Sequence, residues 1–182
     1  MIKRLREAYS AEELASIYAT PHQHKEWKDH IHRVEMTIAF AKWFGEVTSI
    51  ADLSCGDGAI INALSAQEKY LGDFAPGYDF HGAIEQTIRE IPSVDLFICS
   101  ETLEHLDDPL AVLKEIRKKT RYLALSTPYG EIDKGNPQHY WGWDKEGISS
   151  LLHQAGFKPV IYTLLEFFDP SLTYNYQLWG CQ

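Results

Sequence analysis

From residue 48 onwards, short apolar runs alternate with polar turns and amphipathic helical segments, and this alternation limits the possible folds more than any other feature. It is typical of a parallel sheet flanked by helices. The predicted strands cover residues 48–54, 69–73, 94–100, 122–126, 159–166 and 173–180. The predicted helices cover residues 59–66, 83–91, 109–118 and 144–155. The last two strands have no helix between them, so we expect them to pair antiparallel.

One edge of the expected sheet looks short. Asp73 ends the second run, and only residues 74–77 separate it from the next candidate strand at 78–81. A parallel crossover needs about a dozen residues or more. Either residues 78–81 are not a parallel strand, or the usual strand and its preceding helix have been trimmed away. We therefore expect a Rossmann-like α/β sheet with a shortened edge near residues 73–82.

The first 47 residues carry no strand pattern. Apolar residues at three- and four-residue spacings predict helices over 11–19 and 29–44. The polar segment 20–27 between them, called the linker below, contains Trp27 and is suited to folding over a ligand. No repeat or Pro/Ser-rich stretch divides the 182 residues, so we expect one domain. Within it, residues 1–47 form a helical lead-in or cap, and residues 48–182 form the core.

Charge and composition exclude several classes of function. Acidic residues outnumber basic ones by 26 to 17, and the net charge of −9 disfavours broad binding to phosphate backbones or anionic membranes. Cys55, Cys99 and Cys181 are widely spaced, which is not the pattern of a disulfide framework or a zinc ribbon. No apolar run approaches the roughly 20 residues that span a bilayer, and the first residues do not read as a secretory signal. We expect a cytoplasmic protein with reduced thiols.

The strongest chemical signal is an apolar strand that ends in small residues directly before a helix. Gly56 and Gly58 allow a ligand to approach the backbone closely, and the helix N-terminus offers free N–H groups. Asp52 lies in this strand. Asp73 ends the next one, where a carboxylate can accept hydrogen bonds from ribose hydroxyls. The pattern predicts a nucleotide-like cofactor; the alternative is a glycine-containing turn beside a surface aspartate.

The segment Asp-Leu-Ser-Cys-Gly-Asp-Gly at 52–58 resembles the first motif of class I S-adenosylmethionine-dependent methyltransferases, acidic-x-Gly-x-Gly-x-Gly, with Ser54 in place of the first glycine. Segments 94–109, 126–128, 139–144 and 151–157 are similar to later motifs of that superfamily in the same order. The resemblance covers residues 48–165. It implies that S-adenosylmethionine is the cofactor, with Asp52 and the turn at its amino-acid end, Asp73 at its ribose and residues 82–84 beside its adenine. The implied cofactor-binding residues are Asp52, Ser54, Gly56, Asp57, Gly58, Asp73 and Ser100.

An acidic turn with a histidine follows the strand at 94–100. Glu101 and Glu104 are three residues apart, so a helical turn would place both carboxylates on one side, with His105 beside them. With His139 downstream, the pattern is similar to the E-x-x-E-H…H arrangement of two groups of metal-dependent O-methyltransferases. One acts on catechol-like ubiquinone precursors and the other on the 3′-terminal ribose of small RNAs. The resemblance implies that Glu101, Glu104, His105 and His139 ligate a divalent metal.

Mixed oxygen and imidazole ligands suit Mg²⁺ or Mn²⁺, and such a cation lowers the pKa of an acceptor oxygen. The alternative is that the two glutamates are solvated and His105 caps local backbone. Without a metal, His105, His139 and Glu101 are the candidate catalytic groups, with histidine the more suitable base near neutral pH.

Aromatic side chains near these motifs are candidates for binding the acceptor. We expect Trp27, Tyr140 and Trp141 to line the acceptor site. Arg33 lies in the lead-in, where it could contact the cofactor or the acceptor. Four histidines, His22, His24, His30 and His32, do not follow a zinc spacing, so we expect them to form a solvated polar face.

The sequence therefore predicts a methyltransferase that moves a methyl group from S-adenosylmethionine to an acceptor hydroxyl, with help from a metal. One alternative is a catalytically silent protein that binds S-adenosylmethionine and acts as a regulatory or scaffolding subunit. A nicotinamide oxidoreductase fits less well because the Gly-x-Gly-x-x-Gly fingerprint is absent. A small-molecule acceptor is favoured over an RNA terminus by the acidic charge. The identity of the acceptor and the oligomeric state are left open.

Overall fold

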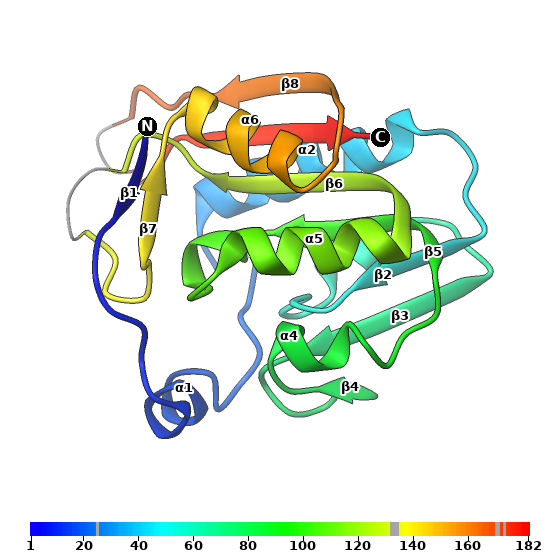
Figure 1. The fold of residues 1–182 in the computed structure, drawn as a ribbon, viewed down its shortest axis with the longest axis horizontal. Coiled ribbons are helices and arrows are strands. Elements are labelled where there is room, and N and C mark those ends of the chain that lie inside the picture. The colour runs from blue at the N-terminus through cyan, green and yellow to red at the C-terminus, as the bar shows by residue number, and fades with distance from the viewer. Residues whose placement is uncertain (25, 132–134, 170–171, 173) are drawn as a thin grey trace.

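A central sheet with helices on both faces forms the computed structural model, which describes residues 1–24, 26–131, 135–169, 172 and 174–182 (Figure 1). Its seven described strands lie in the order β4-β3-β2-β5-β6-β9-β8. The strands are β2 (Ser49–Asp52), β3 (Glu68–Asp73), β4 (Phe80–His81), β5 (Val94–Ser100), β6 (Thr120–Pro128), β8 (Pro159–Leu165) and β9 (Tyr176–Cys181). The strands from β4 to β6 are parallel, and β9 is antiparallel to both β6 and β8. The expected Rossmann-like sheet and its antiparallel end are confirmed; Thr173, the expected start of the last strand, lies outside the described residues.

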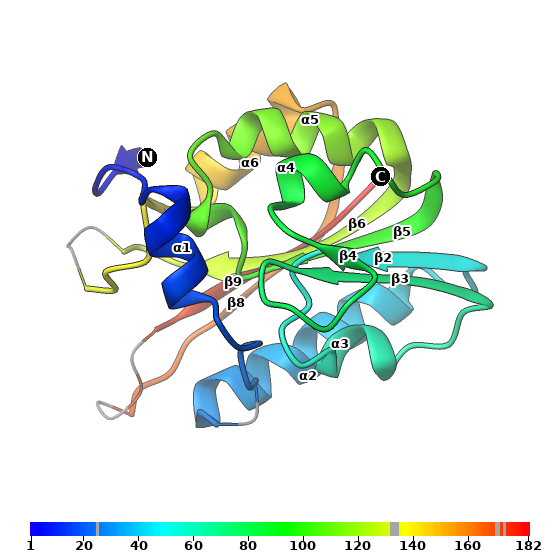
Figure 2. The same ribbon diagram turned by 90° about the horizontal axis from the view of Figure 1, so that it is seen from below.

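The helices form two layers, one on each face of the sheet (Figure 2). On one face lie α2 (Lys28–Trp43) and α3 (Ala59–Asn62), and on the other lie α4 (Ile84–Thr87), α5 (Pro109–Lys119) and α6 (Lys145–Gln154). Helix α5 begins where the Asp108 side chain accepts a hydrogen bond from the N–H of Ala111, and Pro109 occupies its first turn. Its buried residues pack on the β5–β6 side of the core. The sheet is thus covered on both faces, which leaves its strand ends as the accessible edge.

The shortened edge is confirmed, and its construction differs from both expected alternatives. Strand β4 is present, with only two residues, and pairs parallel with β3 through Gly72↔Phe80 and Asp73↔His81. The helix that usually precedes such a strand is replaced by residues 74–79. A two-residue strand needs a return of only about 7 Å, which a short loop can cover. A Cβ on Gly72 would lie 2.6 Å from the Phe80 carbonyl oxygen, so the close approach of β4 depends on glycine there.

The expectation of no strand in residues 1–47 is wrong at the N-terminus. Strand β1 (Ile2–Arg4) pairs antiparallel with β7 (Trp141–Trp143), and Leu5 continues the contact by donating its N–H to the Tyr140 carbonyl. Three residues are too few to give a periodic pattern, and the partner strand is far away in sequence. The two predicted helices are present as α1 (Ala11–Ile17) and α2, and a capping box between Ser10 and Glu13 starts α1.

None of the helices in the described part of the chain combines the length and the apolar character that a membrane crossing requires.

Candidate functional site

A cavity of about 270 Å³ opens at the carboxyl ends of the parallel strands. It lies where the order of strands reverses between β2 and β5, which is the usual ligand site of open α/β sheets. Leu14 of α1 and His22 and His24 of the linker are among its lining residues. Its polar lining comes from His22, His24, His30, Arg33, Ser54, Asp73, Glu85, Ser100, Glu101, Thr102, His105, Asn136, Gln138 and His139.

The turn after β2 is held by the carboxylate that ends β3. Asp73 Oδ2 accepts a hydrogen bond from the N–H of Gly56 at 2.7 Å, and its Oδ1 accepts from the N–H of Ala75 at 2.8 Å. Gly56 has φ of 55°, a left-handed conformation that favours glycine. A Cβ there would lie 2.6 Å from His24 Cε1, so glycine also lets the linker pack on the turn. The two strand ends therefore form one rigid wall of the cavity.

The predicted cofactor residues divide into two groups. Ser54, Gly56, Asp73 and Ser100 line the cavity. Asp52, Asp57 and Gly58 are not among its lining residues. Asp57 instead accepts a hydrogen bond from the N–H of Ala59 at 3.0 Å, and lies 2.6 Å from Nδ1 of His24. Asp52 is buried beneath the turn, and burial raises its pKa to about 7.

Arg33 is a fully buried cation beside the end of β5. Its Nη1 donates to Ser100 Oγ at 2.6 Å, while Nε and Nη2 have no hydrogen-bond partner among the described residues. Ser100 Oγ in turn lies 2.7 Å from Ser126 Oγ. A buried guanidinium with free donors is costly unless an anion pairs with it. Because Arg33 also lines the cavity, it can bind an anionic group of a ligand.

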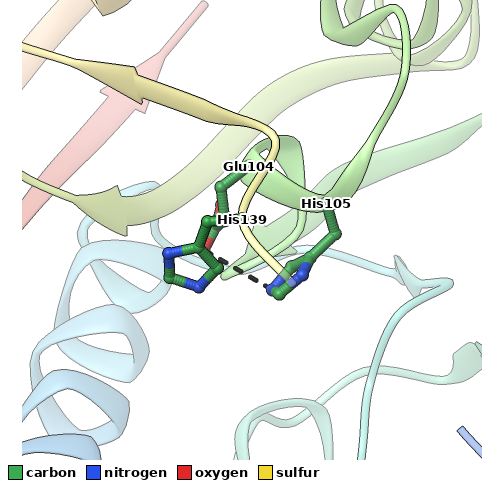
Figure 3. Close-up of side chains that lie close together, drawn as sticks. All are labelled: Glu104, His105 and His139. Atoms are coloured by element: carbon green, nitrogen blue, oxygen red, sulfur yellow. Dashed lines mark ion pairs between the residues drawn. The ribbon is translucent and has the colours of Figure 1, made fainter. Parts of the chain in front are cut away.

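Glu104, His105 and His139 form a cluster whose two histidines line the cavity (Figure 3). One possible ligand atom from each of the three lies within 4.8 Å of the others. The Glu104 side chain is fully buried: Oε2 accepts from Thr127 Oγ1 at 3.1 Å, and Oε1 has no partner among the described residues. Oε1 lies 3.9 Å from Nε2 of His105. Burial raises the pKa of Glu104 well above its usual value, and the Glu101 carboxylate raises it further.

Both imidazoles have Nδ1 held by an oxygen. His105 Nδ1 lies 3.0 Å from the Gln138 carbonyl and 3.2 Å from the Tyr18 hydroxyl. His139 Nδ1 lies 2.6 Å from Glu131 Oε2. The two rings are 4.9 Å apart and nearly perpendicular. Metal-binding histidines usually have one ring nitrogen fixed in this way, which leaves the other as the ligand.

Glu101 was predicted as a fourth ligand, but the structure does not bring it into the cluster. Its Oε1 accepts a hydrogen bond from Ser126 Oγ at 3.0 Å. Glu101 does line the cavity, and it is the one non-glycine residue with positive φ, 53°, in the described part of the chain. Such a conformation is uncommon outside glycine and is concentrated at functional sites. Glu101 is thus a strained, half-buried carboxylate beside the cluster.

The three predicted acceptor-binding aromatics are not among the residues that line the cavity. Trp27 is 55% exposed at the start of α2. Tyr140 is buried, and its hydroxyl accepts a hydrogen bond from the N–H of Tyr9. Trp141, in β7, donates its indole N–H to the carbonyl of Leu106. The aromatics that do line the cavity are Tyr18, Phe74 and Tyr174. They were not predicted because no sequence motif marks the segments that contain them.

The expected solvated face of histidines is wrong for two of its four members. His22 and His32 are exposed, whereas His24 is buried and His30 half-buried. His22, His24 and His30 line the cavity. Burial lowers the pKa of His24 and of His30 to about 4, with the Arg33 charge adding to the effect. These rings are therefore neutral near pH 7. Lys25 of the linker lies outside the described residues.

No family model matches this sequence, and no curated protein matches it. Among solved structures, the N-methyltransferase NodS of Bradyrhizobium japonicum with S-adenosylhomocysteine has a TM-score of 0.70 and 14% identity, over 93% of this chain and 96% of that one. The 1,6-didemethyltoxoflavin-N1-methyltransferase of Burkholderia thailandensis also has a TM-score of 0.70 and 14% identity, over 99% and 93% of the two chains. Magnesium protoporphyrin IX methyltransferase of Synechocystis has a TM-score of 0.65 and 16% identity, over 94% of this chain and 93% of that one. At these identities the likeness establishes the fold, which is that of class I S-adenosylmethionine-dependent methyltransferases.

Proposed function

We propose that this chain is an S-adenosylmethionine-dependent methyltransferase. The observation that carries the proposal is the buried Arg33, which lines the same cavity as the Gly56 turn and Asp73. Two of its guanidinium nitrogens have no hydrogen-bond partner among the described residues. A ligand with a carboxylate at one end and a ribose at the other matches this lining. The likeness to structures with bound S-adenosylhomocysteine supports the same cofactor.

The residues present fit that cofactor along its length. Arg33 would bind its carboxylate, the Gly56 turn would contact its amino-acid end, and Asp73 would accept hydrogen bonds from its ribose hydroxyls. The segment that includes Gly82 and Ile84 lines the cavity where the adenine is expected. When bound, S-adenosylmethionine supplies an electrophilic methyl group. The contribution of the chain is to orient the acceptor toward that methyl and to exclude water with α1 and the linker.

We further propose that the acceptor is a hydroxyl and that a divalent cation, Mg²⁺ or Mn²⁺, assists. Glu104, His105 and His139 would hold it, with Glu101 beside them. The unpartnered Oε1 of Glu104 supports this because a buried carboxylate next to a second carboxylate is costly without a positive charge. A cation at this position would lower the pKa of the acceptor hydroxyl. Without a cation, His105 or His139 would accept the acceptor proton as a base.

A small molecule is the proposed acceptor, and an RNA terminus is the alternative. Two of the similar structures are methyltransferases whose names give small aromatic substrates, a toxoflavin precursor and a magnesium porphyrin. The net charge of −9 favours the same class. A cytoplasmic location, and a lead-in of residues 1–47 that acts as a cap over the core, are part of the proposal.

Calorimetric titration with S-adenosylhomocysteine, followed by assays of cofactor consumption with catechols, sugars and short RNA, tests the proposal. We expect binding, and turnover with at least one hydroxyl acceptor that rises on addition of Mn²⁺. Absence of binding would refute the cofactor assignment. Binding without turnover on any acceptor class would favour the catalytically silent regulatory protein instead.

A further inference from the structure

The loop before β7 contains a carboxylate that no motif indicated. Glu131 and His139 are both almost completely buried at the side-chain level, at 8% and 5% exposure, and Glu131 Oε2 lies 2.6 Å from His139 Nδ1. The other oxygen, Oε1, accepts the backbone N–H of Asn136 at 3.3 Å. A Cβ on Gly142 would collide with the Glu131 carbonyl, so glycine in β7 lets this backbone pack tightly against the strand. Glu131 is therefore a fixed partner of His139.

The contact with Asn136 indicates which nitrogen of His139 carries the proton. Its Oδ1 accepts the N–H of Gln138 at 2.9 Å, so its Nδ2 is the atom that faces His139 Nε2 at 3.0 Å. An amide nitrogen only donates, so Nε2 must be the acceptor and Nδ1 must carry the hydrogen. Glu131 Oε2, an acceptor, lies 2.6 Å from that nitrogen. Two independent contacts thus select one tautomer.

We propose that Glu131 is a positioning residue that holds His139 as the Nδ1–H tautomer and so presents the Nε2 lone pair to the cavity. The inference rests on the proposed function, since Nε2 is the atom that would bind the cation or accept the acceptor proton. Asn136 occupies that lone pair in the absence of a ligand. It therefore competes with a cation, whereas Glu131 prepares the site for one.

The Glu131→Gln variant separates these roles. Its single amide oxygen is needed by the Asn136 N–H, so its amide nitrogen would face His139 Nδ1 as a second donor. That conflicts with the Nδ1–H tautomer. In the Asn136→Ala variant the carboxylate stays, so the tautomer is retained and the competing donor is lost.

The experiment records ¹H–¹⁵N correlations of histidine-labelled, metal-free protein at mildly alkaline pH, with the His139 signals assigned by their loss in His139→Gln. Native protein and Asn136→Ala are expected to show the Nδ1–H pattern, and Glu131→Gln a mixture or the Nε2–H pattern. Manganese titration by electron paramagnetic resonance follows. We expect affinity to fall about 10- to 100-fold in Glu131→Gln and not to fall in Asn136→Ala.

An unchanged His139 tautomer in folded Glu131→Gln, or a tautomer lost only in Asn136→Ala, would overturn the inference. A changed tautomer in Glu131→Gln, together with a native chain that binds no Mn²⁺, supports the role of Glu131 and refutes the cation. Far-ultraviolet circular dichroism on each variant confirms folding, so the two failures remain distinguishable.

Discussion

Two buried carboxylates, Asp73 at the end of β3 and Glu104 after β5, differ in how many of their oxygens have a hydrogen-bond partner. The cofactor wall is the side of the cavity formed by the Gly56 turn and Asp73, and the imidazole wall is the side lined by His105 and His139, with Glu104 next to them. Asp73 accepts a backbone N–H at each oxygen, so its charge is stabilised by the fold itself. Glu104 has one oxygen bonded to Thr127 and the other without a partner among the described residues. Both oxygens of the carboxylate in the cofactor wall therefore have a hydrogen-bond partner within the protein. The imidazole wall retains an unpaired acceptor, which is the feature expected where a ligand completes the site.

Replacing the unsatisfied carboxylate should have the largest effect. Glu104→Gln keeps the acceptor for Thr127 and removes the charge, so we expect methyl transfer to a hydroxyl to fall by roughly 10²–10⁴-fold. Manganese binding should be lost with it. The free energy of unfolding should stay constant or rise by about 1 kcal/mol, because the cost of burying an ionisable carboxyl next to Glu101 is gone.

Glu115→Gln is the matched control for that variant, since Glu115 lies in α5, pairs with Lys118 and is not among the residues that line the cavity. Its activity should equal that of the native chain. If Glu104→Gln also retained native activity, the imidazole wall would have no part in catalysis.

Replacing Arg33 should weaken binding of the cofactor rather than slow the methyl transfer itself. Arg33→Met keeps the apolar stem and removes the buried charge, so the affinity for S-adenosylhomocysteine should fall about 10- to 100-fold, as for a lost charged hydrogen bond. Isothermal titration calorimetry measures this, with Arg121→Met on the exposed part of β6 as the control. Equal affinities in the two variants would show that Arg33 does not contact the cofactor.

The cofactor wall was largely predictable from the sequence because it is local. Strand, turn and helix follow one another between residues 49 and 62, and Asp73 ends the strand paired beside them. The imidazole wall was predictable only in part. Glu104, His105 and His139 came from a resemblance, while Glu131 lies in a loop without periodicity and meets His139 only through tertiary packing.

Short elements explain the errors in the predicted fold. Strand β1 has three residues and finds its partner β7 across almost the whole chain. The predicted helices over 59–66 and 83–91 contract to the four-residue helices α3 and α4. Local pattern cannot specify such elements, because their stability comes from the packing around them. The places of Trp141 and Tyr140 were hidden from the sequence for the same reason, because both residues contact β1 and Leu5 from far along the chain.

Asp52, which is buried beneath the Gly56 turn, should make the free energy of unfolding depend on pH. Burial raises its pKa to about 7, against about 3.9 in an unfolded chain. Between these values Asp52 holds a proton in the folded chain and not in the unfolded chain, so its contribution to stability falls as the pH rises from about 4 to about 7. The slope is at most about 1.4 kcal/mol per pH unit. His24 and His30, whose pKa values are lowered to about 4, contribute in the opposite direction.

Asp52→Asn should lack that slope, and urea unfolding of both chains across the same pH range measures the difference. Parallel stability curves would mean that Asp52 stays ionised in the fold.

The smallest expected effect concerns Trp27, which was predicted to touch the acceptor and is instead 55% exposed. If the cavity seen here is the acceptor site, Trp27→Ala should change neither kcat nor KM for the acceptor by more than about twofold, and stability by less than about 0.5 kcal/mol. Tyr174→Ala is the matched comparison, because Tyr174 lines the cavity with its ring 5.5 Å from His139. Its KM for the acceptor should rise while the affinity for S-adenosylhomocysteine stays at the native value. A rise in KM in Trp27→Ala, with none in Tyr174→Ala, would move the acceptor site from the imidazole wall to the outer surface of α2.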